Sequence, residues 1–257
     1  MPKVIVCGRG GSGKSTLVSL LASELRSRGL VLVVDADESN LGLNAMLGLE
    51  QPMRSIMDYL GGKQEVGMKL MAMLRSEGNE KVQLFVRELA LGDLPPECLS
   101  ANRVLCMVRI GKIEHSMEGC ACPMGAVARD FLNQLCVDAG QWVLVDTEAG
   151  VEHFGRGILE GADFILVIVD PSQEAVILAE KACRLAEEAG KHYGVVLSKI
   201  DERTRVILEE KLACNGLSPL GVVPYSPLIA HANLEGESLR DESIRGELLH
   251  ILNALEL

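Results

Sequence analysis

The sequence predicts an α/β fold in which a mainly parallel β-sheet is flanked by helices on both faces. Short aliphatic runs alternate along the chain with longer segments of helical spacing, an alternation typical of parallel strands joined by right-handed crossovers. Hydrophobic residues make up 48% of the 257 residues, and aromatic residues only 3%. A core of small and aliphatic side chains suits strands that are covered on both faces.

The individual strands and helices are predicted from the spacing of the apolar residues. The predicted strands are residues 4–7, 30–34, 104–110, 142–145, 164–169, 193–197 and 220–223. The predicted helices are residues 14–28, 126–139, 173–189, 202–213 and 239–255. Residues 50–100 are expected to form helices and loops, with Met68, Met71 and Met73 packed in the core. Since no repeat or linker divides the chain, residues 1–257 are predicted to form a single domain.

The formal net charge is −11, and it argues against a nucleic-acid partner. A nucleic-acid-binding protein needs a positive surface to displace counterions, and no Lys/Arg cluster supplies one here. No apolar run approaches the roughly 20 residues that span a bilayer, and the N-terminus lacks the pattern of a signal peptide. We therefore expect a cytoplasmic protein with no nucleic-acid and no membrane partner.

A glycine-rich loop follows the first predicted strand and precedes the first predicted helix. Its sequence, Gly-Arg-Gly-Gly-Ser-Gly-Lys-Ser, matches the phosphate-loop pattern G-x-x-x-x-G-K-[ST] in full. Glycines let backbone N–H groups turn inward around an anion, and the helix N-terminus adds positive potential. We expect Lys14 to bridge the β- and γ-phosphates of a nucleoside triphosphate, and the Ser15 hydroxyl to ligate Mg²⁺. The nucleotide-binding residues predicted here are Gly8, Arg9, Gly10, Gly11, Ser12, Gly13, Lys14, Ser15 and Thr16.

Acidic residues follow two of the predicted strands. Asp35 and Asp37 come after residues 30–34, and Asp146 comes directly after residues 142–145. Ligands collect at the carboxyl ends of the strands in open α/β sheets. We expect Asp146 to hold Mg²⁺ through water on the side opposite Ser15, and Asp37 to orient or deprotonate the attacking water. Either aspartate alone would serve as a helix cap, but beside a phosphate loop we favour the catalytic interpretation.

One pair among the eight cysteines stands apart from the rest. Cys120 and Cys122 are separated by one residue in a loop flanked by Gly and Pro. A disulfide is strained at that spacing, whereas two thiolates form half of a metal site. Zn²⁺ takes four ligands in a tetrahedron and Ni²⁺ can take four in a plane, so a two-fold partner would complete either site. His115 is an alternative ligand, and either metal fits the pair.

The glycine-rich loop, with a basic residue in second place, resembles the deviant phosphate loop of the MinD/ParA/nitrogenase-iron-protein superclass. Within that superclass the chain is most similar to the CooC-type ATPases, which help to insert nickel into carbon monoxide dehydrogenase. The resemblance implies a homodimer that closes over two ATP molecules, with carbon monoxide dehydrogenase as its client. It also supports a shared Ni²⁺ or Zn²⁺ site. The stretches that carry it are residues 8–16, Cys120-Ala121-Cys122-Pro123, and residues 146–153, 155–157, 223–225 and 232–236.

Two residues depart from the pattern of the superclass. Arg9 stands where a lysine usually reaches into the partner's active site. Arginine keeps the charge and adds a planar fork suited to phosphate, so we expect Arg9 to act catalytically as an arginine finger. Ser198 stands where an asparagine usually reads the base, and a hydroxyl offers fewer hydrogen bonds than an amide. The nucleotide-binding residues expected on this side are Ser198, Lys199, Pro224 and Tyr225.

These observations lead to the hypothesis of a homodimeric, Mg²⁺-dependent ATPase of metallocentre assembly. A nickel-inserting GTPase is one alternative, because Ser198-Lys199-Ile200-Asp201 approximates the guanine-reading pattern [NT]-K-x-D. An electron-transfer ATPase is another, since four cysteines at a dimer axis would equally hold a [4Fe–4S] cluster. A partitioning ATPase would need a basic C-terminal helix or a DNA-binding patch, and the tail is acidic instead.

Overall fold

The computed structural model describes residues 2–75, 83–85, 87–113, 122–154 and 157–255. Within these residues one sheet has the strand order β3-β4-β2-β5-β1-β6-β7-β8. Neighbouring strands are parallel, except that β3 pairs antiparallel with β4 at one edge. The strands are β1 (Lys3–Gly8), β2 (Leu30–Ala36), β3 (Leu99–Asn102), β4 (Leu105–Arg109), β5 (Gln141–Thr147), β6 (Phe164–Val169), β7 (His192–Ile200) and β8 (Pro219–Pro224).

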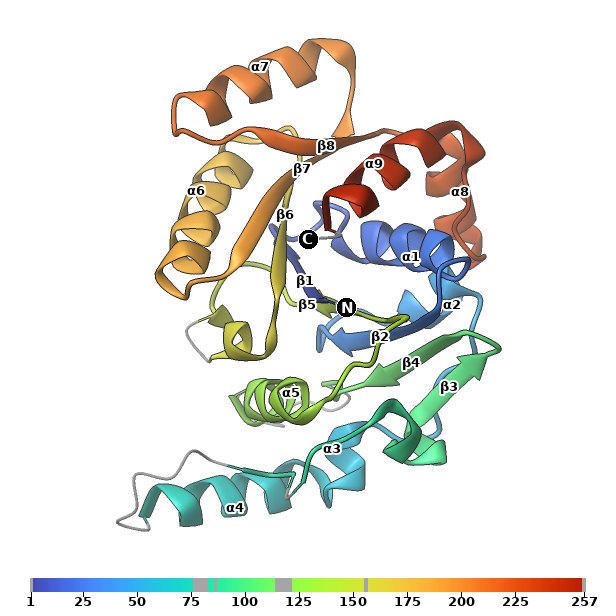
Figure 1. The fold of residues 1–257 in the computed structure, drawn as a ribbon, viewed down its shortest axis with the longest axis vertical. Helices are drawn as coiled ribbons and strands as arrows, with labels where there is room; N and C mark the ends of the chain where they lie inside the picture. The colour runs from blue at the N-terminus through green and yellow to red at the C-terminus, as the bar shows by residue number, and fades with distance from the viewer. Residues whose placement is uncertain (1, 76–82, 86, 114–121, 155–156, 256–257) are drawn as a thin grey trace.

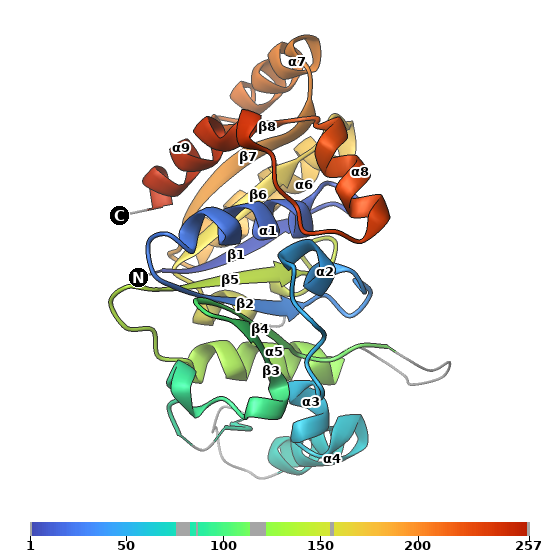
Figure 2. The same ribbon diagram turned by 90° about the vertical axis from the view of Figure 1, so that its right-hand side faces the viewer.

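Helices cover both faces of this sheet, and Figure 1 shows α1, α2, α8 and α9 on one side of it and α5 and α6 on the other. After a turn of 90°, α7 lies beside β8 while α3 and α4 lie beyond the β3–β4 edge (Figure 2). The α-helices are α1 (Lys14–Leu25), α2 (Leu43–Leu47), α3 (Ile56–Tyr59), α4 (Gly62–Arg75), α5 (Cys122–Gln134), α6 (Gln173–Glu188), α7 (Glu202–Ala213), α8 (Pro227–Glu235) and α9 (Arg245–Leu255). Short 3₁₀ turns are η1 (Leu91–Asp93), η2 (Pro96–Cys98), η4 (Ile158–Gly161) and η5 (Glu242–Ile244).

The alternation of side chains along each strand builds two cores, one on each face of the sheet. In β1, Val4 and Val6 pack into the core that α1 and α9 cover, and Ile5 and Cys7 pack into the core that α5 and α6 cover. All four side chains are fully buried. The aliphatic run that predicted the strand is therefore continuous because both faces are covered.

The predicted fold class is confirmed, with several local differences. The elements β3, α2 and α8 were not predicted. α5 begins at Cys122, four residues before the predicted start, and α9 begins at Arg245, six residues after the predicted start. The expectation that Met68 and Met71 lie in the core is wrong, because their side chains are 62% and 59% exposed. α4 packs at the edge of the molecule and buries Val66 on its inner face. Val66 and Leu70, four residues apart, pack toward the core, so Met68 and Met71 lie on the outer face of this amphipathic helix. No helix of the described residues has the length and apolar character needed to cross a membrane.

A close backbone approach at Gly29 tests the packing of β2 against the turn before β5. A Cβ on Gly29 would lie 1.9 Å from the carbonyl oxygen of Gly140, which accepts the hydrogen bond of the Leu30 amide. We expect Gly29→Ala to lower the free energy of unfolding by about 2–3 kcal/mol, because backbone must move. Gly246→Ala is the matched control, since nothing lies within 4 Å of its added methyl group. Equal urea midpoints for the two variants would contradict this packing.

Candidate functional site

The glycine-rich loop joins the carboxyl end of β1 to the first turn of α1, as the sequence predicts. Gly11 has φ +75° and Gly13 has φ +103°, a left-handed region that side chains other than glycine rarely adopt. Glycine turns of this kind let successive backbone N–H groups face an anion in a concave, positively polarised surface. The start of α1 adds the partial positive charge of a helix N-terminus. The loop therefore has the shape expected of a phosphate cradle.

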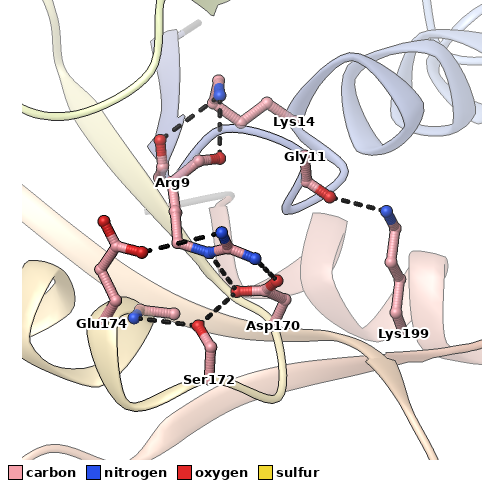
Figure 3. A network of polar contacts seen from close by, with 9 residues as sticks. Arg9, Gly11, Lys14, Asp170, Ser172, Glu174 and Lys199 are labelled. Atoms are coloured by element: carbon pink, nitrogen blue, oxygen red, sulfur yellow. Dashed lines mark hydrogen bonds and ion pairs between the residues drawn. The ribbon is translucent and has the colours of Figure 1, made fainter.

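Lys14 is buried in this loop and folds back onto it. Its ammonium donates to the carbonyl oxygens of Gly8 at 3.3 Å and Arg9 at 3.2 Å, as Figure 3 shows. Among the described residues no carboxylate lies within ion-pair distance of Lys14. Its charge is thus held by neutral oxygens and stays available to an anionic ligand.

Ser15, Asp146 and Asn40 meet beside the loop. The Ser15 hydroxyl donates to Asp146 Oδ2 at 2.6 Å, and the Asn40 amide donates to Ser15 Oγ at 2.8 Å and to Asp146 Oδ2 at 3.2 Å. Asp146 is fully buried, and its second oxygen, Oδ1, has no hydrogen-bond partner among the described residues. Burial raises the pKa of Asp146 to about 7, and the nearby Asp35 and Asp37 act in the same direction. A hydroxyl beside an unsatisfied carboxylate oxygen is a hard donor set that fits Mg²⁺.

The predicted catalytic aspartate, Asp37, lies just beyond the carboxyl end of β2. It is 8% exposed, and its Oδ1 accepts hydrogen bonds from the Ser39 amide and hydroxyl at 2.9 and 2.6 Å. Two residues earlier, Asp35 forms an ion pair with Lys112 in which Nζ and Oδ2 are 2.8 Å apart. Burial raises the pKa of Asp35 to about 6 even though Lys112 lowers it. The end of β2 and the loop after it thus hold two acidic side chains, Asp35 and Asp37, in a poorly solvated place.

Arg9 is held by acidic groups of its own chain. Its Nη2 lies 2.7 Å from Asp170 Oδ2, and its Nη1 lies 3.7 Å from Glu174 at the start of α6 (Figure 3). Burial raises the pKa of the Asp170 carboxyl, but hydrogen bonds from Arg9 and Ser172 outweigh it, so this pKa lies below its ordinary value. The described protomer therefore directs Arg9 toward the end of β6.

The residues predicted to contact the base lie at the carboxyl ends of β7 and β8. Lys199 has φ +58°, and its ammonium donates to the Gly11 carbonyl oxygen at 2.6 Å. Ser198 is buried beside the loop, and its hydroxyl lies 3.0 Å from where a Cβ on Gly13 would be. Pro224 ends β8, and Tyr225 is 59% exposed. The sheet thus brings these residues to the edge that carries the phosphate loop.

Asp201 bears on the GTPase alternative. Its carboxylate accepts from the Thr204 amide at 2.8 Å and caps the N-terminus of α7. A guanine-reading aspartate needs its carboxylate for the ring. The arrangement therefore favours a helix cap over base recognition at this position.

Comparison with known proteins identifies the family. The CobQ/CobB/MinD/ParA nucleotide binding domain matches residues 3–239. The chain belongs to this family. An uncharacterised ATP-binding protein of Methanocaldococcus jannaschii is 41% identical over 241 residues, which are 93% of this chain and 94% of the relative. The carbon monoxide dehydrogenase accessory protein CooC of Rhodospirillum rubrum is 29% identical over 246 residues, which are 94% of this chain and 90% of the relative.

Comparison with solved structures supports the fold. The septum site-determining protein MinD of Pyrococcus horikoshii, solved with Mg-ADP, superposes with a TM-score of 0.69 at 17% identity. The match covers 100% of this chain and 96% of that one. Together with the family and its ATP-binding relatives, this makes the chain an ATPase of the MinD/ParA type.

Parts of the predicted metal site in this MinD/ParA-type ATPase fall outside the described residues. Cys120 and His115 lie outside the residues that the structure describes. Cys122 is placed only as the first residue of α5. Within the ranges that the structure describes, no three or more His, Cys, Asp and Glu side chains are grouped to hold a metal. His153 is buried, and its ring contacts the ring of Phe154 edge to face.

Three residues of the site were not predicted from the sequence. Asp170 directly follows the strand predicted at residues 164–169, the same signal that singled out Asp146, so it could have been found. Asn40 lies three residues after Asp37 in the same loop and carries a weaker signal. Lys112 carries none, because a lysine after an aliphatic strand normally indicates a solvated end.

The position of Lys14 leads to a direct test of nucleotide binding. We expect Lys14→Met to lose at least tenfold in ATP affinity, because the variant lacks the charge that spans the β- and γ-phosphates. Lys191→Met is the matched control, since that ammonium donates to the carbonyl oxygens of Glu160 and Ala162 away from the loop. Calorimetric titration with ATP and Mg²⁺ measures both variants. Wild-type affinity in Lys14→Met would contradict the assignment of the phosphate loop.

Proposed function

We propose that this ATPase acts in the cytoplasm as a homodimer that binds nickel or zinc and assists nickel insertion into a carbon monoxide dehydrogenase. The observation that carries the proposal is the 29% identity with CooC of Rhodospirillum rubrum over 246 residues. The Cys120-Ala121-Cys122-Pro123 segment supports it, because it supplies soft ligands in a protein of this family. The 41% identical relative is itself uncharacterised and names no client.

In this proposal the phosphate loop binds ATP, and aspartates at the carboxyl ends of β2 and β5 act on the water and on Mg²⁺. Backbone N–H groups of residues 8–13 and the Lys14 ammonium bind the phosphates of ATP, and Thr16 completes the first turn of the helix. Ser15 and Asp146 would hold Mg²⁺, which supplies positive charge to the β- and γ-phosphate oxygens when bound. Asp37 orients the attacking water and accepts its proton, which its position at the end of β2 allows. Base contacts come from Ser198, Lys199, Pro224 and Tyr225.

Arg9 has a second position in the proposed dimer. In the described protomer it pairs with Asp170 across 2.7 Å, with a third of its side chain exposed. Ion pairs that water reaches contribute little to stability, so a stronger anion can draw Arg9 away. The γ-phosphate of ATP bound to the partner is such an anion, and a planar guanidinium suits it. We therefore place Arg9 in the partner's site only in the closed dimer.

In this proposal, closure of the dimer also forms the metal site. Each protomer contributes Cys120 and Cys122, and a two-fold axis brings two such pairs together. Four thiolates satisfy either tetrahedral Zn²⁺ or planar Ni²⁺. ATP binding closes the dimer and forms the site, and hydrolysis reopens it and releases the metal to the client. A slow rate suits this cycle, because the ATPase sets the time during which metal is held.

A mixed-dimer experiment tests whether Arg9 acts across the dimer. Arg9→Ala and Asp37→Asn should each bind ATP and hydrolyse it poorly. In a mixed dimer one site has its own Asp37 and the partner's Arg9, so a 1:1 mixture should recover about one quarter of wild-type activity by random pairing. Native mass spectrometry would verify that mixed dimers form. If they form without recovery, Arg9 acts within its own chain.

The cysteine pair predicts a fixed metal stoichiometry. Calorimetric titration with Zn²⁺ or Ni²⁺, alongside light scattering, should give one metal per two chains and a metal-stabilised dimer. Binding should weaken at low pH, because thiolates must lose protons to bind. Cys120→Ala/Cys122→Ala should lose the metal and keep ATP hydrolysis.

A matched control uses two other cysteines. Cys136 and Cys214 are exposed and free, so Cys136→Ala/Cys214→Ala should bind metal as the wild type does. One metal per single chain, or metal retained without Cys120 and Cys122, would refute the shared site. A brown protein with visible absorbance after anaerobic purification would favour the iron–sulfur alternative instead.

A further inference from the structure

Lys112 is a charged side chain buried where none was expected. It follows β4, and its side chain is only 2% exposed. The ammonium contacts both carboxylate oxygens of Asp35, at 2.9 Å from Oδ1 and 2.8 Å from Oδ2, and donates to the carbonyl oxygen of Asp37. Burying a lysine is costly unless it is paired. The contact with Asp37 is to the backbone of the residue proposed to orient the water.

The chain around Lys112 is joined to the loop of Asp37 over several residues. The Ile110 amide donates to the Asp35 carbonyl oxygen at 2.9 Å, and the Ile113 amide donates to the Glu38 carbonyl oxygen at 3.4 Å. These backbone bonds lie on either side of the Lys112 contacts. Residues 110–113 therefore extend the pairing of β4 with β2 beyond the end of the sheet. Lys112 adds the side-chain contacts of this extension.

Electrostatics explains why a cation belongs at this position. Asp35 and Asp146 are paired in register on the neighbouring strands β2 and β5, and both are almost fully buried. Asp35 and Asp37 raise the pKa of Asp146, so the three carboxylates act on one another. Without a counter-charge, repulsion would push the Asp37 loop away from β5. The Lys112 ammonium attracts Asp35 and binds the Asp37 carbonyl oxygen, which opposes that displacement.

We propose that Lys112 is a positioning residue for ATP hydrolysis, which fixes the backbone of Asp37 so that its carboxylate faces the attacking water. The inference rests on the role proposed for Asp37. Lys112 acts through Asp37, whose carbonyl oxygen accepts its hydrogen bond. Loss of its contact should therefore lower kcat and leave the KM for ATP unchanged, because the phosphate loop is not involved. A misplacement of about 1 Å at a catalytic group can cost roughly a hundredfold in rate.

The competing explanation is a purely structural ion pair. Breaking a buried pair by removing one partner destabilises a protein, while replacing both partners by neutral groups is often tolerated. Lys112→Met alone would confuse the two explanations, since it leaves Asp35 buried without a cation. Asp35→Asn breaks the ion pair but keeps the Lys112 ammonium beside the Asp37 carbonyl. Asp35→Asn/Lys112→Met removes both charges together.

The experiment compares Asp35→Asn with Asp35→Asn/Lys112→Met in the full chain, using steady-state ATP hydrolysis and thermal unfolding. We expect kcat of the double variant to lie about 10- to 100-fold below that of Asp35→Asn. The KM for ATP should agree within about twofold, and melting temperatures should show that both proteins are folded. Equal kcat values for the two folded variants would overturn the proposal and leave Lys112 a structural partner of Asp35.

Asp37→Asn, measured in parallel, separates this inference from the proposed function. Full activity in Asp37→Asn would show that Asp37 was given the wrong role, whatever the result for Lys112. A slow Asp37→Asn together with equal kcat values for the Asp35 variants would refute only the role of Lys112. If the double variant binds ATP tenfold more weakly, Lys112 supports the nucleotide pocket and the positioning role is refuted.

Discussion

Two buried carboxylates lie side by side on neighbouring strands at the carboxyl edge of the sheet, and the site is organised around them. Asp35 of β2 and Asp146 of β5 are in register, and burial raises their pKa values to about 6 and about 7. Like charges in a poorly solvated place oppose folding unless cations or hydrogen-bond donors accompany them. The chain supplies Lys112 for Asp35, and the Ser15 hydroxyl and Asn40 amide for Asp146.

This arrangement leaves one requirement to be met by a ligand. Asp146 accepts two hydrogen bonds on Oδ2, but Oδ1 has no partner among the described residues. A divalent cation beside Ser15 would offset both the burial and the repulsion. The same cation would neutralise the phosphates held by Lys14 and the loop, so nucleotide and metal bind best together. A site that is unfavourable when empty is common where function needs strong binding.

Local signals in the sequence predicted most of the fold and the centre of the site. The phosphate loop, Asp37 and Asp146 were identified because each follows a buried strand, and the parallel topology then brings the strand ends together. Pairings between distant segments were not predictable in this way. Lys112 meets Asp35 across 77 positions of the chain, and Arg9 meets Asp170 across 161. The edge strand β3 was missed because Leu99–Asn102 is short and half exposed.

The central claim is that the buried Asp146 binds Mg²⁺ together with Ser15. The magnesium dependence of the melting temperature tests this claim. The measurement is the melting temperature of the wild type and of Asp146→Asn with ATP, in Mg²⁺ or in EDTA. At about 100 times Kd, Mg²⁺ should raise the wild-type value by roughly 5–10 °C over the EDTA sample. Asp146→Asn should melt higher than the wild type without ligand, because a costly buried charge is gone, and should gain little from Mg²⁺. An equal gain from Mg²⁺ in both proteins would contradict the account.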